Sequence, residues 1–163
     1  MDNKQICISG TNNRYMMKKA TKAPVVEKKR IGIANIEFVN QIDLISGQMN
    51  PTVEQQIVKK ISGYKQQDIK KGVYDDQRFI KIGLITDKMR ETGLKCYYCN
   101  VEMMILYETV RESKQWTVDR IDNDIGHNMD NYHLACLSCN LKRRRRDDEK
   151  FLFTKQLSIV KTV

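Results

Sequence analysis

The sequence predicts an α+β fold in which a small, mostly helical scaffold precedes a metal-pinned module of two strands and a helix. Apolar residues between positions 50 and 92 recur at helical spacing, which indicates the scaffold. Two Cys-x-x-Cys pairs follow, and they indicate the metal. Between the pairs, two stretches rich in β-forming residues flank a turn-rich segment, which is typical of a hairpin.

Length and composition favour one soluble domain. A chain of 163 residues with 40% hydrophobic and 30% charged residues can bury a single core. No stretch approaches the roughly 18 apolar residues of a membrane span, so no membrane partner is expected. Because no secretory signal is visible, we expect an intracellular, reducing compartment, either cytoplasm or nucleus. No heptad repeat is visible, and the oligomeric state stays open.

The net charge of +9 favours a polyanionic partner, most simply DNA, with RNA left open as a substrate. Residues 1–30 carry eight Lys or Arg and two acidic residues. They show no sustained apolar period and are predicted to form a basic, flexible arm. The arm is equally compatible with phosphate contacts and with a solvated tail that has no specific partner.

Residues 31–94 are predicted to form the scaffold. The near-alternating run Ile31–Phe38 suggests a short extended segment. Asn50-Pro51 suits a helix start, with Gly63 as its end. A second short helix is expected over Tyr64–Lys71, and Asp75-Asp76 can cap a further helical segment that stops at Gly93.

The two cysteine pairs match the spacing of a four-thiolate zinc site. They are separated by 36 residues (100–135), and each pair can offer two sulfurs to one tetrahedral ion. Two disulfides would need an oxidising compartment and would leave Cys7 over. A thioredoxin-like redox motif would show a single pair after a strand. Structural zinc is therefore the prediction, held by Cys96, Cys99, Cys136 and Cys139.

The predicted hairpin lies between the cysteine pairs. Trp116–Val118 and Tyr132–Ala135 favour strands, and residues 122–131 favour a loop. A helix is expected to start near Cys139, with its distal part, within residues 146–163, packing on the scaffold. A knuckle, a hairpin and a helix form a treble-clef-like unit, which is too small to be stable without its metal.

Residues 95–145 carry a family resemblance. The run Val118-Asp119-Arg120-Ile121, then Gly126, Asn131, Cys136-x-x-Cys139-Asn140 and Lys142, resembles the HNH endonuclease motif of the zinc-containing ββα-metal kind. The resemblance implies that Asp119 and Asn140 bind a catalytic Mg²⁺ or Mn²⁺, which prefers oxygen ligands. It implies that Asn131 holds the loop by hydrogen bonds. Asp122 and Asn123 are interpreted as turn formers.

One position departs from the family pattern. Arg120 stands where the family usually has the histidine that activates water, and a guanidinium cannot act as a general base. Arg120 could clamp the scissile phosphate instead. His127, in the loop, is the candidate replacement base, while His133 lies within the second predicted strand. Activation by the metal ion without a protein base is a further possibility.

A basic run follows the second cysteine pair, and it is expected to grip phosphates. Four consecutive arginines cannot share one face of a helix, so at least two should face solvent or phosphate. The run contains Lys142, Arg143, Arg144, Arg145 and Arg146.

The leading hypothesis is a metal-dependent DNA endonuclease or nickase. The alternatives are a non-catalytic, zinc-stabilised DNA-binding module and a protein-interaction zinc domain without affinity for DNA.

Overall fold

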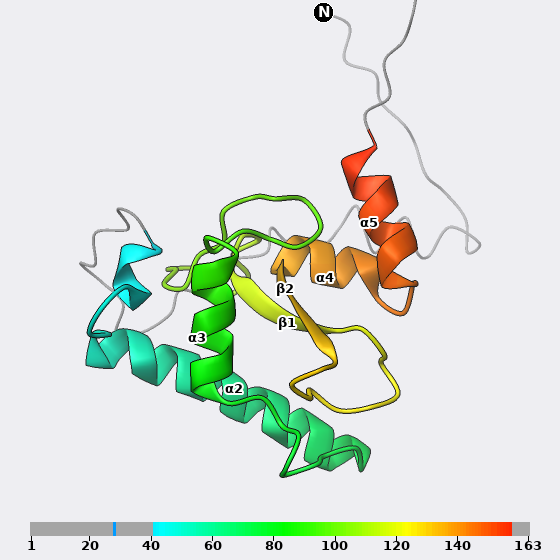
Figure 1. Ribbon diagram of the computed structural model, residues 1–163, viewed down its shortest axis with the longest axis horizontal. Coiled ribbons are helices and arrows are strands. Elements are labelled where there is room, and N and C mark those ends of the chain that lie inside the picture. The colour runs from blue at the N-terminus through cyan, green and yellow to red at the C-terminus, as the bar shows by residue number, and fades with distance from the viewer. Residues whose placement is uncertain (1–27, 29–40, 158–163) are drawn as a thin grey trace, which may run out of the picture.

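The computed structural model describes residue 28 and residues 41–157. The predicted basic arm and the extended run Ile31–Phe38 lie outside these residues, apart from Lys28. The described chain is an α+β structure with one two-stranded antiparallel sheet (Figure 1). None of its helices is long and apolar enough to cross a membrane.

Helix α2 spans Pro51–Lys71 as one continuous element. Asn50 caps its start, because the Asn50 side chain accepts a hydrogen bond from the Thr52 backbone N–H at 2.8 Å. Gly72 ends it in the left-handed conformation, with φ at 69°. The sequence predicts two helices divided at Gly63, but the buried face continues across that residue. Its buried residues keep helical spacing: Val53, Ile57, Ile61, Tyr64 and Asp68.

Helix α3 spans Ile82–Glu91 and ends just before Gly93, as predicted. Its start is later than Asp75-Asp76 suggests. The Asp75 carboxylate accepts hydrogen bonds from the backbone N–H groups of Gln77 and Arg78, so it closes a turn. A short 3₁₀ helix, η2, spans Asp43–Ile45 before α2.

The predicted hairpin is formed by strands β1, Trp116–Arg120, and β2, Tyr132–Cys136. They pair antiparallel with Trp116 opposite Cys136 and Arg120 opposite Tyr132. Helix α4, Leu137–Arg143, starts on the second cysteine pair, and Cys136 serves as its N-cap residue. The β2–α4 connection is therefore made by a cysteine itself.

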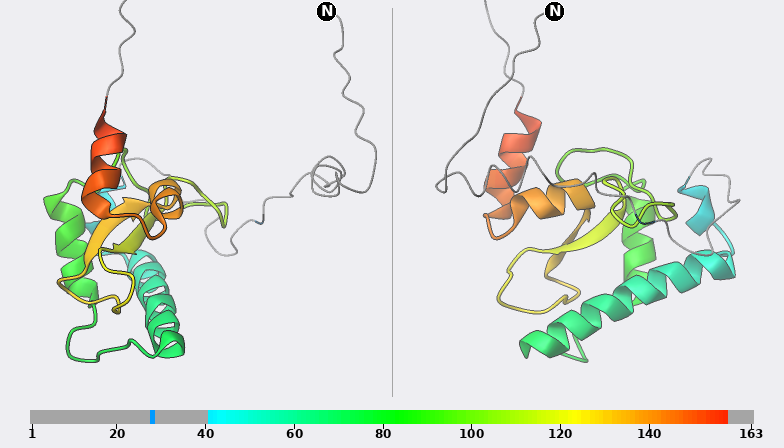
Figure 2. Two further views of the ribbon diagram at one scale, coloured as in Figure 1. Left: turned by 90° about the vertical axis from the view of Figure 1, so that its right-hand side faces the viewer. Right: turned by 180° about the vertical axis from the view of Figure 1, so that it is seen from behind.

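The hairpin lies between α4 on one side and the α2–α3 pair on the other (Figures 1 and 2). Helix α2 runs along the free edge of β1, where the Val118 backbone N–H donates to the Tyr64 hydroxyl at 3.1 Å. Because alternate residues of a strand point to the same face, the side chains of Thr117 and Asp119 share one face of the hairpin. Their partners show that it is the α4 face, since Asn140 and Arg143 both belong to α4.

The basic run interrupts the predicted C-terminal helix. Arg144 adopts a positive φ of 57° after α4, and a separate helix, α5, spans Asp148–Gln156. The Asp147 carboxylate caps α5 by accepting a hydrogen bond from the Lys150 N–H at 2.9 Å. The described part of the C-terminal segment packs on the cysteine module. The buried ring of Phe151 packs edge-on against the Tyr98 ring, with the ring centroids 4.9 Å apart.

Candidate metal centre and basic turn

The four predicted ligands form one cluster. The sulfur atoms of Cys96, Cys99, Cys136 and Cys139 all lie within 4.8 Å of one another. Zn–S bonds of about 2.3 Å in a tetrahedron require sulfur separations of about 3.8 Å. The sulfurs of Cys99 and Cys136 are 3.9 Å apart. The cluster could therefore hold a metal ion and is compatible with structural zinc.

The acidities of the thiols show why a cation suits this cluster. Hydrogen bonding to Cys136 lowers the pKa of Cys96. The same hydrogen bond, and then burial, raise the pKa of Cys136. Burial, followed by the charge of Cys96, raises the pKa of Cys139 to about 12. Crowded sulfurs thus resist joint ionisation, and a bound divalent cation would remove that resistance.

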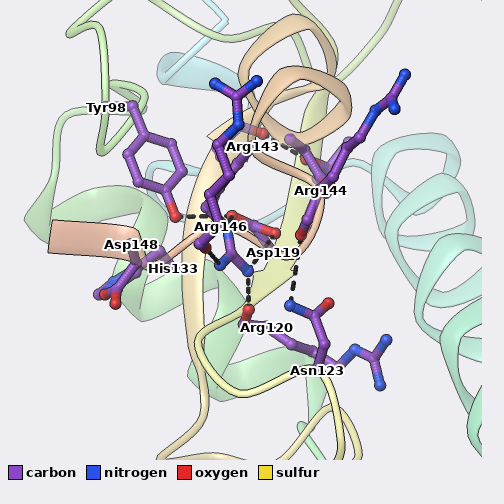
Figure 3. Close-up of polar contacts among 12 residues, drawn as sticks. Tyr98, Asp119, Arg120, Asn123, His133, Arg143, Arg144, Arg146 and Asp148 are labelled. Atoms are coloured by element: carbon purple, nitrogen blue, oxygen red, sulfur yellow. Dashed lines mark hydrogen bonds and ion pairs between the residues drawn. The ribbon is translucent and has the colours of Figure 1, made fainter. Parts of the chain in front are cut away.

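Asp119, the predicted ligand of the catalytic cation, forms an ion pair with Arg143. Its Oδ2 accepts from Arg143 Nε at 2.6 Å, and its Oδ1 accepts from Arg143 Nη2 at 3.1 Å (Figure 3). The side chains of Asp119 and Arg143 are 4% and 1% exposed. This is a bidentate, buried pair, which is the strongest geometry for such an interaction.

Tyr98 completes the surroundings of Asp119. Its hydroxyl donates to Asp119 Oδ2 at 2.7 Å. Burial, followed by this hydrogen bond, raises the pKa of Tyr98, so the phenol stays a donor at neutral pH. Burial by itself lowers the pKa of the Arg143 guanidinium. The hydrogen bonds to Asp119 and the negative charge of Asp119 raise it, and their combined effect is larger, so the pKa of Arg143 is raised.

Arg143 also joins the end of β1 to the turn between α4 and α5. Its Nη1 donates to the Arg146 carbonyl at 2.6 Å, and its Nη2 donates to the Arg120 carbonyl (Figure 3). The residue was expected among the phosphate contacts, and here the structure differs. A guanidinium that is buried on a carboxylate and two carbonyls has no face left for phosphate.

Asn140, the second predicted ligand of the cation, lies on the same side of the hairpin as Asp119. Its Nδ2 donates to Thr117 Oγ1 at 3.0 Å, and Thr117 is two residues before Asp119 on β1. Asn140 is half-buried, and no hydrogen bond to its Oδ1 is recorded within the described residues. The module thus brings both predicted oxygen ligands to one face.

Arg120 and His127 lie on the opposite side of the hairpin, facing α2. Arg120 Nη1 donates to the Ile125 carbonyl at 2.9 Å, so the Arg120 side chain stabilises the loop between β1 and β2. The His127 ring stacks on Tyr64 of α2 with centroids 4.6 Å apart. The structure therefore does not bring the candidate base or the candidate phosphate clamp to Asp119 and Asn140.

Asp68 of α2 anchors the loop through His127. Asp68 Oδ2 accepts a hydrogen bond from the His127 backbone N–H at 2.7 Å, and Asp68 Oδ1 forms a second hydrogen bond with His127 Nδ1, also at 2.7 Å. Burial lowers the pKa of His127, although Asp68 opposes the shift. Next to it, a Cβ on Gly126 would lie 2.5 Å from the Val73 carbonyl oxygen, so only glycine fits this approach. The loop is pinned to the scaffold.

Asn131 makes the loop hydrogen bonds that the resemblance implies. Its Oδ1 accepts from the Asp122 N–H at 2.8 Å, and its Nδ2 donates to the carbonyls of Asp122 and Gly126. Asp122 in turn accepts from the Asp124 N–H, which is the turn-forming role expected of it. Asn123 donates to the Arg144 carbonyl at 3.4 Å and so links the loop to the basic turn.

His133 lies on the same face as Asp119, directly opposite it across the hairpin. Its Nε2 lies 3.0 Å from Asp148 Oδ2 at the start of α5. The Tyr97 ring stacks on it with centroids 3.7 Å apart. His133 thereby ties α5 to the hairpin.

The remaining cations of the basic run are exposed. Arg144, Arg145 and Arg146 form the turn between α4 and α5, which we call the basic turn, and Lys142 precedes it. A hollow lies between α4 and α5, and we call it the basic hollow. Four basic side chains line it, those of Lys142, Arg144, Arg146 and Lys155. Within the basic turn, Arg145 forms an exposed ion pair with Asp124.

Comparisons with known proteins identify no relative of this chain. No protein-family model, no curated protein and no solved structure matches the chain.

Sequence reasoning missed three side chains around these sites: Tyr98, Asp148 and Asp68. Tyr98 stands inside the first Cys-x-x-Cys pair, where a buried aromatic residue gives no polar signal. Asp148 is part of an acidic first turn that could have indicated a new helix. Asp68 is one acidic residue on a polar, basic helix, and nothing local distinguishes it from a surface residue.

Proposed function

We propose that this chain binds nucleic acid and hydrolyses its phosphodiester bonds with a divalent cation held by Asp119 and Asn140, on a zinc-stabilised HNH-like module. The observation that carries the proposal is the position of these two oxygen-bearing side chains on the α4 side of the hairpin. The cysteine cluster supports it, because it joins Cys96 and Cys99 to the β2–α4 connection, where the helix that carries Asn140 begins.

The chemistry of the donor set fits a hard cation. A carboxylate and an amide oxygen suit Mg²⁺ or Mn²⁺, which retain several waters and complete their coordination with substrate phosphate. Such an ion would supply Lewis-acid activation of the phosphodiester. The chain's own contribution is to fix Asp119 through Tyr98 and Asn140 through Thr117.

The basic hollow supplies the phosphate contacts in this proposal. Lys142 and Arg144 follow Asn140 in the chain, and their side chains line the hollow together with Arg146 and Lys155. Within the described residues, none of these four side chains forms an ion pair with a carboxylate. Their charges are therefore available to neutralise phosphate. Neutralising phosphates releases condensed counterions, and affinity should therefore fall steeply with salt.

A plasmid assay tests the proposal. Supercoiled DNA is incubated with the purified protein and Mg²⁺ or Mn²⁺, and nicked and linear products are measured. Asp119→Asn and Asn140→Ala should abolish nicking, while Asp124→Asn, which alters only the exposed partner of Arg145, should retain it. Equal nicking by wild type and Asp119→Asn would refute the assignment. Zinc content is measured on each variant to show that the module is intact.

A second candidate function is nucleic-acid binding without hydrolysis. The Asp119–Arg143 pair favours it, because the carboxylate already has a cationic partner. The imidazoles also favour it, since His127 and His133 are both engaged by carboxylates. A mobility shift that weakens with salt, without nicking under either metal, would establish this candidate. Lys142→Ala with Arg144→Ala should weaken the shift, whereas Lys59→Ala on α2 should not.

A further inference from the structure

Arg143 provides Asp119 with the charge and contacts that a bound cation would provide. The guanidinium reaches both carboxylate oxygens, and Tyr98 donates a further hydrogen bond. The pair is buried, so the charge of Asp119 is compensated inside the protein and not by solvent. Asp119 therefore has no uncompensated charge to offer a divalent ion in this conformation.

The position of Arg143 on α4 explains why it competes for the same space. Arg143 follows Asn140 by three residues, and residues three apart on a helix share a face. The side chains of Asn140 and Arg143 both reach β1, at Thr117 and Asp119 respectively. A cation shared by Asp119 and Asn140 would have to lie along this face, where the guanidinium now lies.

We propose that Arg143 is an internal cation that occupies the divalent-metal position of this module, so that metal binding at Asp119 and Asn140 requires the guanidinium to leave. This inference rests on the proposed function for the location of the metal position. It adds that a side chain of the protein itself, Arg143, holds the site in a closed state. A divalent ion must break a bidentate ion pair before it can bind, which weakens its apparent affinity.

The basic turn is linked to this closed state. Arg143 Nη1 donates to the carbonyl of Arg146, and Arg146 lines the basic hollow. Departure of the guanidinium therefore removes one hydrogen bond that fixes the turn. The arginine run thus contains two kinds of residue: one that closes the cation position and three that the turn exposes.

The test measures Mn²⁺ binding to the zinc-loaded full chain by the loss of the free-ion signal in electron paramagnetic resonance. Arg143→Gln removes the positive charge but keeps a donor for the carbonyls of Arg120 and Arg146. Arg145→Gln is the matched control, since it removes the same charge from an exposed position of the run. Asp119→Asn is added to Arg143→Gln to locate the bound ion. If Arg143→Gln does not fold, Arg143→Lys, which keeps the charge but not the bidentate geometry, is measured in its place.

We expect Arg143→Gln to bind one Mn²⁺ at least tenfold more tightly than wild type, Arg145→Gln to match wild type, and the added Asp119→Asn to abolish the gain. Equal affinity of wild type and Arg143→Gln would overturn the inference, and so would an equal gain in Arg145→Gln. If no variant binds Mn²⁺, the inference fails. Plasmid nicking by wild type in the same buffer then decides separately whether the proposed hydrolysis stands.

Discussion

Arg143 at the end of α4 and Asp119 near the end of β1 form a buried, bidentate ion pair. The pair connects the helix to the hairpin on the side that the predicted metal ligands share. Each charge is tolerable inside the protein because the other is present. The same contact therefore bears on stability as well as on metal binding.

Removing one partner of this pair should destabilise the fold strongly. Asp119→Ala leaves a buried guanidinium without a counter-charge, and we expect a loss of about 3–5 kcal/mol in the free energy of unfolding. Urea denaturation followed by circular dichroism measures the loss. Asp124→Ala removes the partner of an exposed arginine and should change stability little. Comparable losses in the two variants would show that burial of the pair has no energetic consequence.

Replacing both partners should cost less than the two single replacements together. In Asp119→Leu with Arg143→Met, no charge is left unpaired, and apolar side chains fill the space. We expect a double-mutant cycle to give a coupling energy of at least about 1 kcal/mol. Strict additivity of the two single losses would mean that the residues do not interact in solution.

Metal removal should unfold the module, because the cysteine cluster joins the knuckle, β2 and α4. A chelator, or Cys139→Ser, is expected to lower the thermal midpoint by more than 10 °C, since structural zinc supplies on the order of 10 kcal/mol. Calorimetry with and without added zinc measures the shift. Cys7→Ser, which changes the cysteine outside the two pairs, should keep the wild-type midpoint. A chelator without effect would contradict the metal assignment.

Stability should fall below neutral pH because of His127. Burial lowers its pKa in the folded protein, while the unfolded chain keeps the ordinary value of 6.5. The unfolded state therefore binds more protons below that value, and stability present above pH 6.5 is lost as the pH falls. The free energy of unfolding is measured from pH 7.5 to 5.5 with zinc content monitored. His127→Asn should show a shallower decline, and an unchanged slope would assign the effect to other groups.

Gly126→Ala should destabilise the loop, because the new Cβ would lie 2.5 Å from the Val73 carbonyl oxygen and 3.0 Å from Asp68 Oδ2. We expect a loss of about 1–3 kcal/mol, as for other overpacked sites. Gly63→Ala is the matched control, since it lies in α2 with no atom within 4 Å of a Cβ. It should stabilise by up to about 1 kcal/mol. A harmless Gly126→Ala would show that the loop can move away from α2.

The sequence by itself determined the elements whose signals are local. The spacing of Cys96, Cys99, Cys136 and Cys139 predicted a cluster that the structure forms. The hairpin also followed from local composition, because β-forming residues flank a run of turn residues. Gly93 marked the end of α3 correctly, because glycine readily adopts the positive φ of 58° found just after this helix.

Only the tertiary structure decided what each polar side chain faces. Arg143 reads as one of four equivalent arginines, yet it alone turns inward, because its place on α4 aims it at a buried carboxylate. His127 lies near Asp119 in sequence but on the other face of the hairpin, where Asp68 from α2 binds it. Burial and charge pairing are set by residues far apart in the chain, and sequence spacing carries no information about them.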